Sequence, residues 1–334
     1  MKTQAPIRWG IIATGFIAAK FATACNFEAK RTGRSILSAV ASRNAKKSAA
    51  FAAEYHIPHS YGSYEELIHD PNIDAIYVAT PHTFHAELSI TALSAGKSVL
   101  CEKPAGLNAM EFHPVVETAR HEKRFYMEAM WMKFNPSFRK ALTWVQEGRI
   151  GKIQYLNGAF FFAAPFNPEG RLFNPSLGGG ALLDVGIYPA TFATMFAGRT
   201  QPDHISSIIK KGSTEVDIYN QAHLVWNSGI MADIASSISL QSLDDIHPAI
   251  ITGETGTILI PAFWRAQQAI LLDTEGHKIE HFNAPFECNG YEYELREVEE
   301  CLLSGKTESP VHTYADSAMV LKILDTIRMA AQNE

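Results

Sequence analysis

Two short segments of the sequence carry the side chains best suited to moving a proton. The first is Glu102-Lys103-Pro104, and the second contains Asp184 and Tyr188, which share one face of a helix because they are four residues apart. A phenol with a pKa of about 10 is a weak base at neutral pH, but a nearby ammonium group stabilises the phenolate and lowers that pKa. We therefore expect Lys103 and Tyr188 to act as a catalytic acid–base pair on a hydroxyl proton, while Asp184 orients the pair or hydrogen-bonds the substrate.

Each of these residues also has a simpler interpretation. Lys103 could be a surface lysine in a turn, and Tyr188 could cover the apolar face of a helix. No set of His, Cys and Asp residues has the spacing of a zinc site, so we expect no metal.

The first element that would position a ligand for these groups is a strand followed by a turn. Residues 7–12 form an apolar run, a helical pattern begins at Ile17, and a second apolar run over residues 35–41 completes a strand–helix–strand unit. Such a turn leaves free backbone N–H groups at a helix N-terminus, where a dinucleotide pyrophosphate binds. Only Gly15 remains of the usual G-x-G-x-x-G pattern, so Ala13 must turn with a Cβ present, and an ordinary turn is the alternative. The residues expected to contact the cofactor here are Ala13, Thr14, Gly15, Phe16 and Ile17.

The end of the second strand indicates which dinucleotide is bound. Ser42 and Arg43 stand where an NAD enzyme usually carries Asp or Glu to hold the ribose 2′-hydroxyl. A hydroxyl and a guanidinium suit a 2′-phosphate, because arginine offers two parallel donors and can stack on the adenine. The sequence therefore predicts NADP, and the alternative is a solvated basic loop that opens the next helix.

The remaining patterns predict two domains. Strands and helices alternate as far as residue 128, which is typical of a doubly wound parallel sheet whose ligands bind at the C-terminal strand ends. Two loops fall there, with Thr80, Pro81, His82 and His85 in one and Glu102 and Lys103 in the other. From residue 152 onward, extended segments predict an open, mostly antiparallel sheet. We expect an α/β fold, with a Rossmann domain over residues 1–127 and an α+β domain for substrate binding and dimerisation over residues 128–334, whose C-terminal helix could pack on the first domain.

Composition excludes several classes of protein. The chain has 334 residues and a formal net charge of −6, which argues against a general nucleic-acid binder. No apolar stretch is long enough to span a bilayer, and the N-terminus has no signal-peptide pattern. The four cysteines are scattered, which suits a reducing compartment. We therefore expect a cytoplasmic protein with a small-molecule substrate and with neither a nucleic acid nor a membrane as partner.

Three segments together resemble the glucose–fructose oxidoreductase/inositol dehydrogenase (Gfo/Idh/MocA) family. They are the N-terminal turn, Glu102-Lys103-Pro104, and the glycine-rich segment over residues 178–189. The Glu-Lys-Pro and Asp-x-x-x-Tyr motifs are the specific part, and the resemblance runs from about residue 7 to about residue 325. Many members carry histidine in place of Tyr188. The branch that contains dihydrodiol dehydrogenases and NADP-dependent D-xylose dehydrogenases is similar to this chain in carrying tyrosine.

The resemblance implies an NADP(H)-dependent oxidoreductase that interconverts an alcohol and a carbonyl of a sugar, a cyclitol or a trans-dihydrodiol. It also implies a cis Lys103–Pro104 bond, a nicotinamide ribose beside the Thr80–His85 loop, and a homodimer. The residues expected to line the substrate site are Trp131, which could also contact the cofactor, Phe160, Phe161 and Arg171. For the three aromatic residues, packing in a core is an equal alternative.

Two other functions remain open at this point. One is a non-catalytic NADP-binding regulator of the same fold, and the other is an enzyme similar to biliverdin reductase. A pure sensor needs no acid–base pair, so the presence of Lys103, Asp184 and Tyr188 together favours the enzyme.

Overall fold

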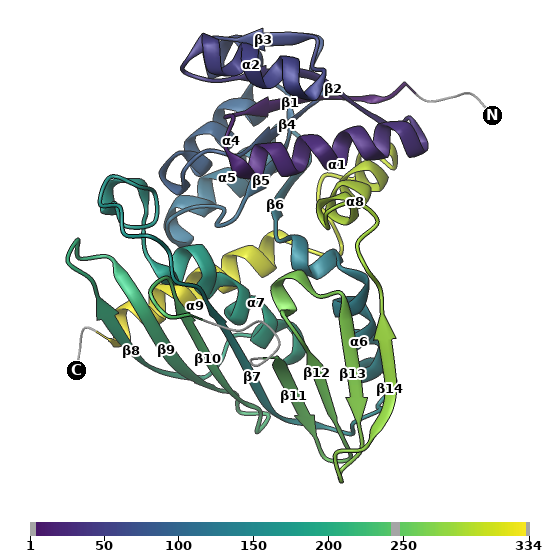
Figure 1. The fold of residues 1–334 in the computed structure, drawn as a ribbon, viewed down its shortest axis with the longest axis vertical. Coiled ribbons are helices and arrows are strands. Elements are labelled where there is room, and N and C mark those ends of the chain that lie inside the picture. The colour runs from purple at the N-terminus through teal and green to yellow at the C-terminus, as the bar shows by residue number, and fades with distance from the viewer. Residues whose placement is uncertain (1–4, 242–247, 332–334) are drawn as a thin grey trace. The chain divides into compact units, whose positions relative to one another are not determined.

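The structure, a computed structural model, describes residues 5–241 and 248–331. The chain divides into two compact units, each of which is built from separate segments (Figure 1). Unit 1 contains Met1–Gly106, Met110–Trp131 and Phe286–Tyr314. Unit 2 contains Leu107–Ala109, Met132–Pro285 and Ala315–Glu334.

Unit 1 is built around a parallel six-stranded sheet with the order β3-β2-β1-β4-β5-β6. Its strands are β1 (Ile7–Ile12), β2 (Ser35–Ala41), β3 (His59–Tyr61), β4 (Ala75–Val78), β5 (Ser98–Glu102) and β6 (Tyr126–Ala129). Its helices are α1 (Phe16–Thr32), α2 (Ala45–Tyr55), α3 (Tyr64–Ile68), η1 (His82–Phe84), α4 (His85–Ser94), α5 (Ala109–His121) and α8 (Tyr291–Leu303). All residues of β4 and β5 are buried, as expected for central strands that are covered on both faces.

This strand order confirms the doubly wound Rossmann arrangement that the alternating pattern predicts. The order reverses between β1 and β4, and at such a reversal the loops on the two sides diverge and leave a crevice at the C-terminal strand ends. The turn after β1 and the loops after β2 and β4 therefore occupy the part of this sheet where a dinucleotide is expected.

Unit 2 contains an eight-stranded sheet with the order β14-β13-β12-β11-β7-β10-β9-β8. Its strands are β7 (Ile153–Phe161), β8 (His204–Lys211), β9 (Asp217–Val225), β10 (Met231–Ser237), β11 (Ala249–Gly253), β12 (Thr257–Ile260), β13 (Gln268–Leu272) and β14 (Lys278–Asn283). Its helices include η2 (Trp131–Phe134), which begins at the last residue of unit 1, α6 (Pro136–Gln146), η3 (Pro175–Leu177), η4 (Leu182–Gly186), α7 (Ile187–Phe196), η5 (Phe263–Arg265) and α9 (Tyr314–Ala330), which begins at the boundary.

The pairing within this sheet confirms the expected open and mostly antiparallel arrangement. The pair β7–β10 is parallel, and the other described pairs of this sheet are antiparallel. Burial alternates along the strands, as in β10, so one face is covered and the other faces outward. Figure 1 shows α6 and α7 on the covered face.

One segment lies in a different unit from the one that the sequence analysis expects. Residues Phe286–Tyr314 belong to unit 1, although they follow the whole of the second sheet in the chain. Helix α8 packs against α1, where the Arg296 guanidinium lies 2.6 Å from an oxygen of the fully buried Glu28 carboxylate. Arg31 pairs with the same carboxylate at 2.7 Å, so the buried charge of Glu28 is matched by arginines from both helices. Helix α9, by contrast, belongs to unit 2 except for its first residue.

None of the helices in the described part of the chain combines the length and the apolar character needed to cross a membrane.

Candidate functional site

The turn between β1 and α1 has the geometry of an anion site. Gly15 is the N-cap of α1, and neither a capping side chain nor an acidic residue occupies the first turn of this helix. A Cβ placed on Gly15 would have nothing within 4 Å, and the residue is exposed. The first N–H groups of a helix carry partial positive charge, so this end of α1 suits a phosphate group.

Ala13 supplies the tight turn in place of the missing glycine. Its φ is 86°, in the region that favours glycine, and its N–H donates to the Ala41 oxygen at 2.9 Å. A residue with a Cβ pays roughly 1–2 kcal/mol for this left-handed conformation. The turn therefore has the backbone conformation of the G-x-G-x-x-G pattern although the first glycine is absent. The strained residue lies in the proposed binding loop.

Ser42 and Arg43 lie at the C-terminal end of β2, as expected. Ser42 is buried, and its hydroxyl accepts a hydrogen bond from the Asn44 N–H at 3.3 Å. Asn44 in turn caps α2 by accepting from two N–H groups of the first turn. The exposed Arg43 guanidinium lies 5.6 Å from the centre of the Phe84 ring, a residue that the sequence analysis did not select. This contact holds Arg43 near the loop that follows β4.

The segment after β4, which includes the short helix η1, contains two buried threonine hydroxyls that are unpaired among the described residues, at Thr80 and Thr83. The Thr80 hydroxyl is buried, and it has no hydrogen-bond partner among the described residues. Unpaired buried hydroxyls are uncommon, so this group is a candidate to bind a cofactor. Pro81 follows Thr80, and the ring of the buried His82 lies 5.7 Å from that of His85, centre to centre.

Lys103 directly follows β5, and the Lys103–Pro104 bond is cis, as the family resemblance implies. The buried Glu102 accepts a hydrogen bond from the hydroxyl of Tyr77 on β4. His85 is fully buried, and its two ring nitrogens lie 2.7 Å from the Pro104 oxygen and 2.8 Å from the Thr80 oxygen. Both ring nitrogens of His85 thus face the protein backbone. This geometry does not favour the contact between His85 and the cofactor that the sequence analysis expects.

Trp131 lies in an aromatic cluster of unit 1. Its ring stacks on that of Tyr291 at 4.9 Å between centres and lies 6.0 Å from that of Phe286. Gly290 allows this approach, because it has a φ of 97° and a Cβ there would lie 2.6 Å from the Trp131 ring. The cluster fixes Trp131 against the segment that begins α8.

In unit 2, a partly buried aspartate fixes the glycine-rich segment that precedes Asp184. The Asp217 carboxylate accepts the Leu182 N–H at 2.6 Å at the start of η4. Gly180 has a φ of 120°, and a Cβ there would lie 2.1 Å from the Asp217 carboxylate, so only glycine fits. Burial raises the pKa of Asp217 to about 6, while its bonds to Leu182 and Asn220 oppose that rise.

Asp184 and Tyr188 lie on two kinds of helix rather than on one. Asp184 is in η4, a π-helical turn, whereas Tyr188 is in the first turn of α7. Gly186 at the junction lets this turn pack closely on β10, because a Cβ there would lie 2.8 Å from the Ser236 hydroxyl. π-Helical turns are frequent at functional sites. The two residues are four apart in the chain, as expected, but they lie in two helical segments of different type.

Asp184 has a charged partner, and Tyr188 lies in an aromatic group. The buried Asp184 carboxylate forms a 2.8 Å ion pair with Arg171, whose side chain is half exposed. The ring of the buried Tyr188 lies 5.5 Å from that of Phe160, which stacks on Trp264 at 3.8 Å. Trp264 was missed by the sequence analysis, although its place directly after a strand, beside Phe263, was a usable signal.

Phe161 does not join this aromatic group. Neighbouring residues of a strand point to opposite faces, and Phe161 contacts Tyr219 at 6.2 Å between ring centres, on the outward face of the sheet. Phe160 and Phe161 therefore lie on opposite faces of β7, and a place for Phe161 in the substrate site stays a prediction.

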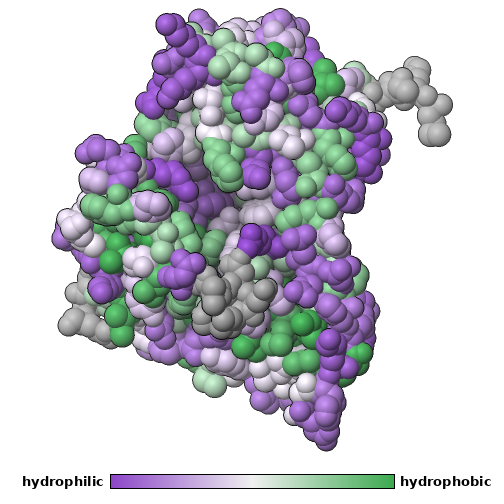
Figure 2. All heavy atoms as spheres, viewed as in Figure 1, coloured by the Kyte–Doolittle hydropathy of each residue, from purple (hydrophilic) through white to green (hydrophobic). Residues whose placement is uncertain are grey.

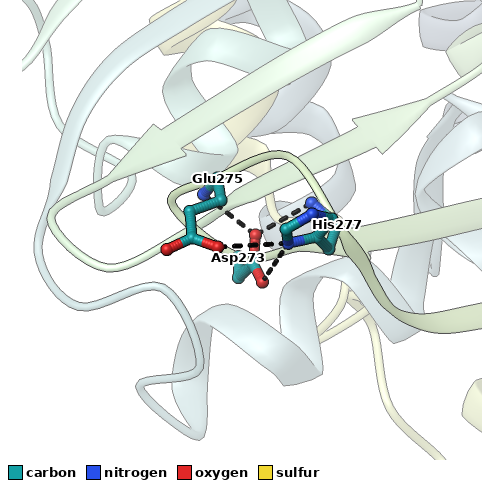
Figure 3. Close-up of side chains that lie close together, drawn as sticks. All are labelled: Asp273, Glu275 and His277. Carbon is teal, nitrogen blue, oxygen red and sulfur yellow. Dashed lines mark hydrogen bonds and ion pairs between the residues drawn. The ribbon is translucent and has the colours of Figure 1, made fainter.

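A further cluster, Asp273, Glu275 and His277, lies in the turn between β13 and β14 (Figure 3). Its ligand atoms lie within 4.8 Å of one another, a spacing that a cation could bridge. The Asp273 carboxylate, however, already accepts the N–H groups of Glu275 at 2.9 Å and His277 at 2.8 Å. These bonds close the turn, which accounts for the cluster as a hairpin feature.

Comparisons with known proteins support the assignment of both halves of the chain. Residues 7–130 match the oxidoreductase family with an NAD-binding Rossmann fold, and residues 138–259 match the GFO/IDH/MocA C-terminal domain. The chain is 34% identical to the mouse (Mus musculus) trans-1,2-dihydrobenzene-1,2-diol dehydrogenase over 332 residues, which cover 97% of this chain and 96% of that protein.

Solved structures show the same fold. A 3-ketoreductase from Actinomadura kijaniata in complex with NADP and TDP-benzene superposes with a TM-score of 0.86 at 25% identity, over 97% of this chain and 98% of that one. An aldose-aldose oxidoreductase from Caulobacter crescentus gives a TM-score of 0.86 at 24% identity, over 98% of each chain.

Proposed function

Since this chain belongs to the GFO/IDH/MocA family of oxidoreductases, we propose that it uses NADP(H) to interconvert an alcohol and a carbonyl on a sugar, a cyclitol or a trans-dihydrodiol. Its NAD(P)-binding Rossmann fold follows from the family. The single observation that carries the choice of NADP is the grouping of three features at one edge of the first sheet. The uncapped N-terminus of α1, Ser42 and Arg43 all lie near the point where the strand order reverses. The names of the relatives above support the substrate classes.

The residues of unit 1 fit such a cofactor. The N–H groups at Gly15 and Phe16 would hold the pyrophosphate, Ser42 and Arg43 the 2′-phosphate, and the Thr80 hydroxyl the nicotinamide half. When bound, the nicotinamide supplies or accepts the hydride. The protein supplies the position of the substrate and the path of the hydroxyl proton.

Cofactor choice can be tested at Arg43. We expect Arg43→Ala to raise the Kd of NADP by about 10- to 100-fold, because a charge-assisted bond to phosphate contributes roughly 1.5–3 kcal/mol. The Kd of NAD should change little, since NAD has no 2′-phosphate. Fluorescence titration of both cofactors measures the effect, and Arg34→Ala is the matched control, because Arg34 precedes the same strand that Arg43 follows. Equal affinity of the wild-type protein for the two cofactors would contradict the NADP proposal.

The proposed chemical roles belong to Lys103, Asp184 and Tyr188. In the proposed reaction Lys103 binds the substrate hydroxyl through its ammonium group, and Tyr188 accepts or returns the hydroxyl proton. Asp184, held by Arg171, would accept a hydrogen bond from a second substrate hydroxyl. The aromatic group of Phe160, Trp264 and Tyr188 offers an apolar wall for a ring.

The experiment that tests this function follows NADPH formation at 340 nm with a panel of aldoses, cyclitols and trans-1,2-dihydrobenzene-1,2-diol. Saturable turnover with at least one member, strictly dependent on NADP, is the expected result. Tight NADP binding without turnover of any member of the panel would instead favour a non-catalytic NADP-binding regulator of the same fold.

We also propose that the chain forms a homodimer through the outward face of the second sheet. Three large apolar side chains on this face, Ile208, Met231 and Ile279, are more than half exposed. Figure 2 shows apolar residues interspersed with hydrophilic ones over the strands of unit 2. Burial of this face in a second copy would remove apolar area from water.

Sedimentation tests the dimer. The wild-type chain is expected to sediment as a dimer at micromolar concentration, and Met231→Arg should raise the dimer dissociation constant at least about tenfold, because it would bury a charge. Met110→Arg, on a still more exposed methionine of unit 1, is the control and should change nothing. A wild-type monomer at this concentration would rule the proposal out.

A further inference from the structure

The peptide group directly after the Lys103–Pro104 bond is held at both of its polar atoms. The Pro104 oxygen lies 2.7 Å from His85 Nδ1, and the Ala105 N–H donates to Glu128 Oε1 at 2.8 Å. Because a peptide group is planar, bonds at its oxygen and its nitrogen fix its orientation together. Proline has no N–H and a restricted φ, so this is the first peptide after Lys103 that side chains can hold at both atoms.

Each of the two side chains has a second polar contact at its far end. His85 Nε2 lies 2.8 Å from the Thr80 oxygen, and Glu128 Oε2 lies 3.0 Å from His312 Nε2. The side chains of His85, Glu128 and His312 are almost completely buried. All the residues that make these contacts lie in unit 1. The contacts link the ends of three neighbouring strands, since Thr80 follows β4, Pro104 follows β5 and Glu128 lies in β6.

The chemistry of the groups explains why these residue types are needed. A carbonyl oxygen only accepts hydrogen bonds, and burial lowers the pKa of His85, which favours a neutral ring with one donor nitrogen. In the Nδ1–H form the ring donates to the Pro104 oxygen. Glu128 is suited to the opposite task, because a carboxylate only accepts and the Ala105 N–H needs an acceptor. Loss of either side chain would leave a buried backbone group without its partner, and the loop would shift to find another.

We infer that His85 and Glu128 are positioning residues that hold the Lys103 ammonium group where the reaction needs it. His312 supports Glu128 from the segment after α8. The inference rests on the proposed function, because it gives Lys103 a reactive role. Neither positioning residue touches the substrate in this scheme, and their effect on turnover passes through the backbone beside Lys103.

The first test measures the loop itself and does not depend on activity. Amide hydrogen exchange of residues 103–107 should become faster in His85→Ala and in Glu128→Ala, because the Ala105 N–H and its peptide group lose their restraints. Glu128→Gln should stay close to the wild type, since the amide oxygen still accepts the Ala105 N–H. The matched control is Lys97→Met. Lys97 precedes the same strand, and its buried ammonium holds two backbone oxygens, of Asp70 and Ile73, at the other end of the sheet.

The second test measures turnover per folded molecule with NADP and trans-1,2-dihydrobenzene-1,2-diol as the probe. His85→Ala and Glu128→Ala should lower kcat about 10- to 100-fold, the loss expected when a reactive group moves by about 1 Å. The Kd of NADP, from tryptophan fluorescence, should change less than about threefold, and Glu128→Gln should restore most of kcat. Lys97→Met should lower Tm and leave kcat unchanged.

A double-mutant cycle separates positioning from general damage. In a Lys103→Met background, His85→Ala should have no further effect on kcat, because the group that it positions is gone. Wild-type exchange in both alanine variants, or a full additional loss of kcat in the Lys103→Met background, would overturn the inference. If Lys103→Met itself keeps wild-type turnover while the exchange of residues 103–107 responds as expected, the proposed role of Lys103 fails and the restraint of the loop stands.

Discussion

Replacing Tyr188 with phenylalanine is expected to lower kcat by about 10²- to 10⁴-fold, the usual contribution of a general acid or base. The substitution removes the hydroxyl and keeps the ring, so the contact with Phe160 at 5.5 Å survives. NADP affinity should stay nearly intact, because Tyr188 lies in unit 2 and the proposed cofactor residues before Lys103 lie in unit 1. Initial rates at 340 nm and fluorescence titration give the two quantities.

A second tyrosine serves as control for this substitution. Tyr55 is partly buried at the end of α2, and Tyr55→Phe should leave kcat unchanged. Nearly full activity of Tyr188→Phe on a good substrate would mean that the proton moves by another route, through Lys103, His82 or bound water.

Lys103→Met is expected to cause a loss of similar size, because it removes the ammonium charge and keeps most of the side-chain length. A moderate rise in the Kd of NADP is also expected, since the ammonium group would contact the cofactor ribose in the proposed site. Lys97→Met is the control, because Lys97 precedes β5 and Lys103 follows it. Turnover of Lys103→Met within a few-fold of the wild type would remove Lys103 from the mechanism.

The double variant measures whether the two residues act as one unit. If they do, Tyr188→Phe combined with Lys103→Met should lose far less than the product of the two single losses, because the first substitution already disables the pair. Fully multiplicative losses would show that the two side chains act on separate steps.

Local pattern was enough to predict much of the fold. Strand β4 is a continuous apolar run and β5 has one at its centre, as expected for strands covered on both faces. Strand β10 instead alternates in burial, as expected for a strand with one covered face. The short edge strand β3 and the exposed strand β14 were not predicted, because neither has an apolar pattern of its own. These two strands form because neighbouring strands of their sheets pair with them.

The features that could not be predicted depend on residues far apart in the chain. The Glu28–Arg296 pair between α1 and α8, and the Glu128–His312 pair beside the Lys103 loop, each join residues separated by more than 180 positions. A glutamate or a histidine in a helical or loop pattern gives no sign of such a partner. The π-helical turn at Asp184 likewise depends on the close packing of Gly186 on Ser236, a contact between separate elements.

The return of α8 to unit 1 also has a consequence for the synthesis of the protein. The ribosome must release the chain as far as Tyr314 before the last segment of unit 1 exists, so the nucleotide-binding half cannot finish folding while the second half is being made. Until then the Glu28 carboxylate has Arg31 of its own helix but not Arg296, and the surface of α1 that α8 covers is exposed. A fragment cut after β6 would stay in that unfinished condition. Folding of unit 1 is therefore completed only after unit 2 has been synthesised, although each unit has its own sheet.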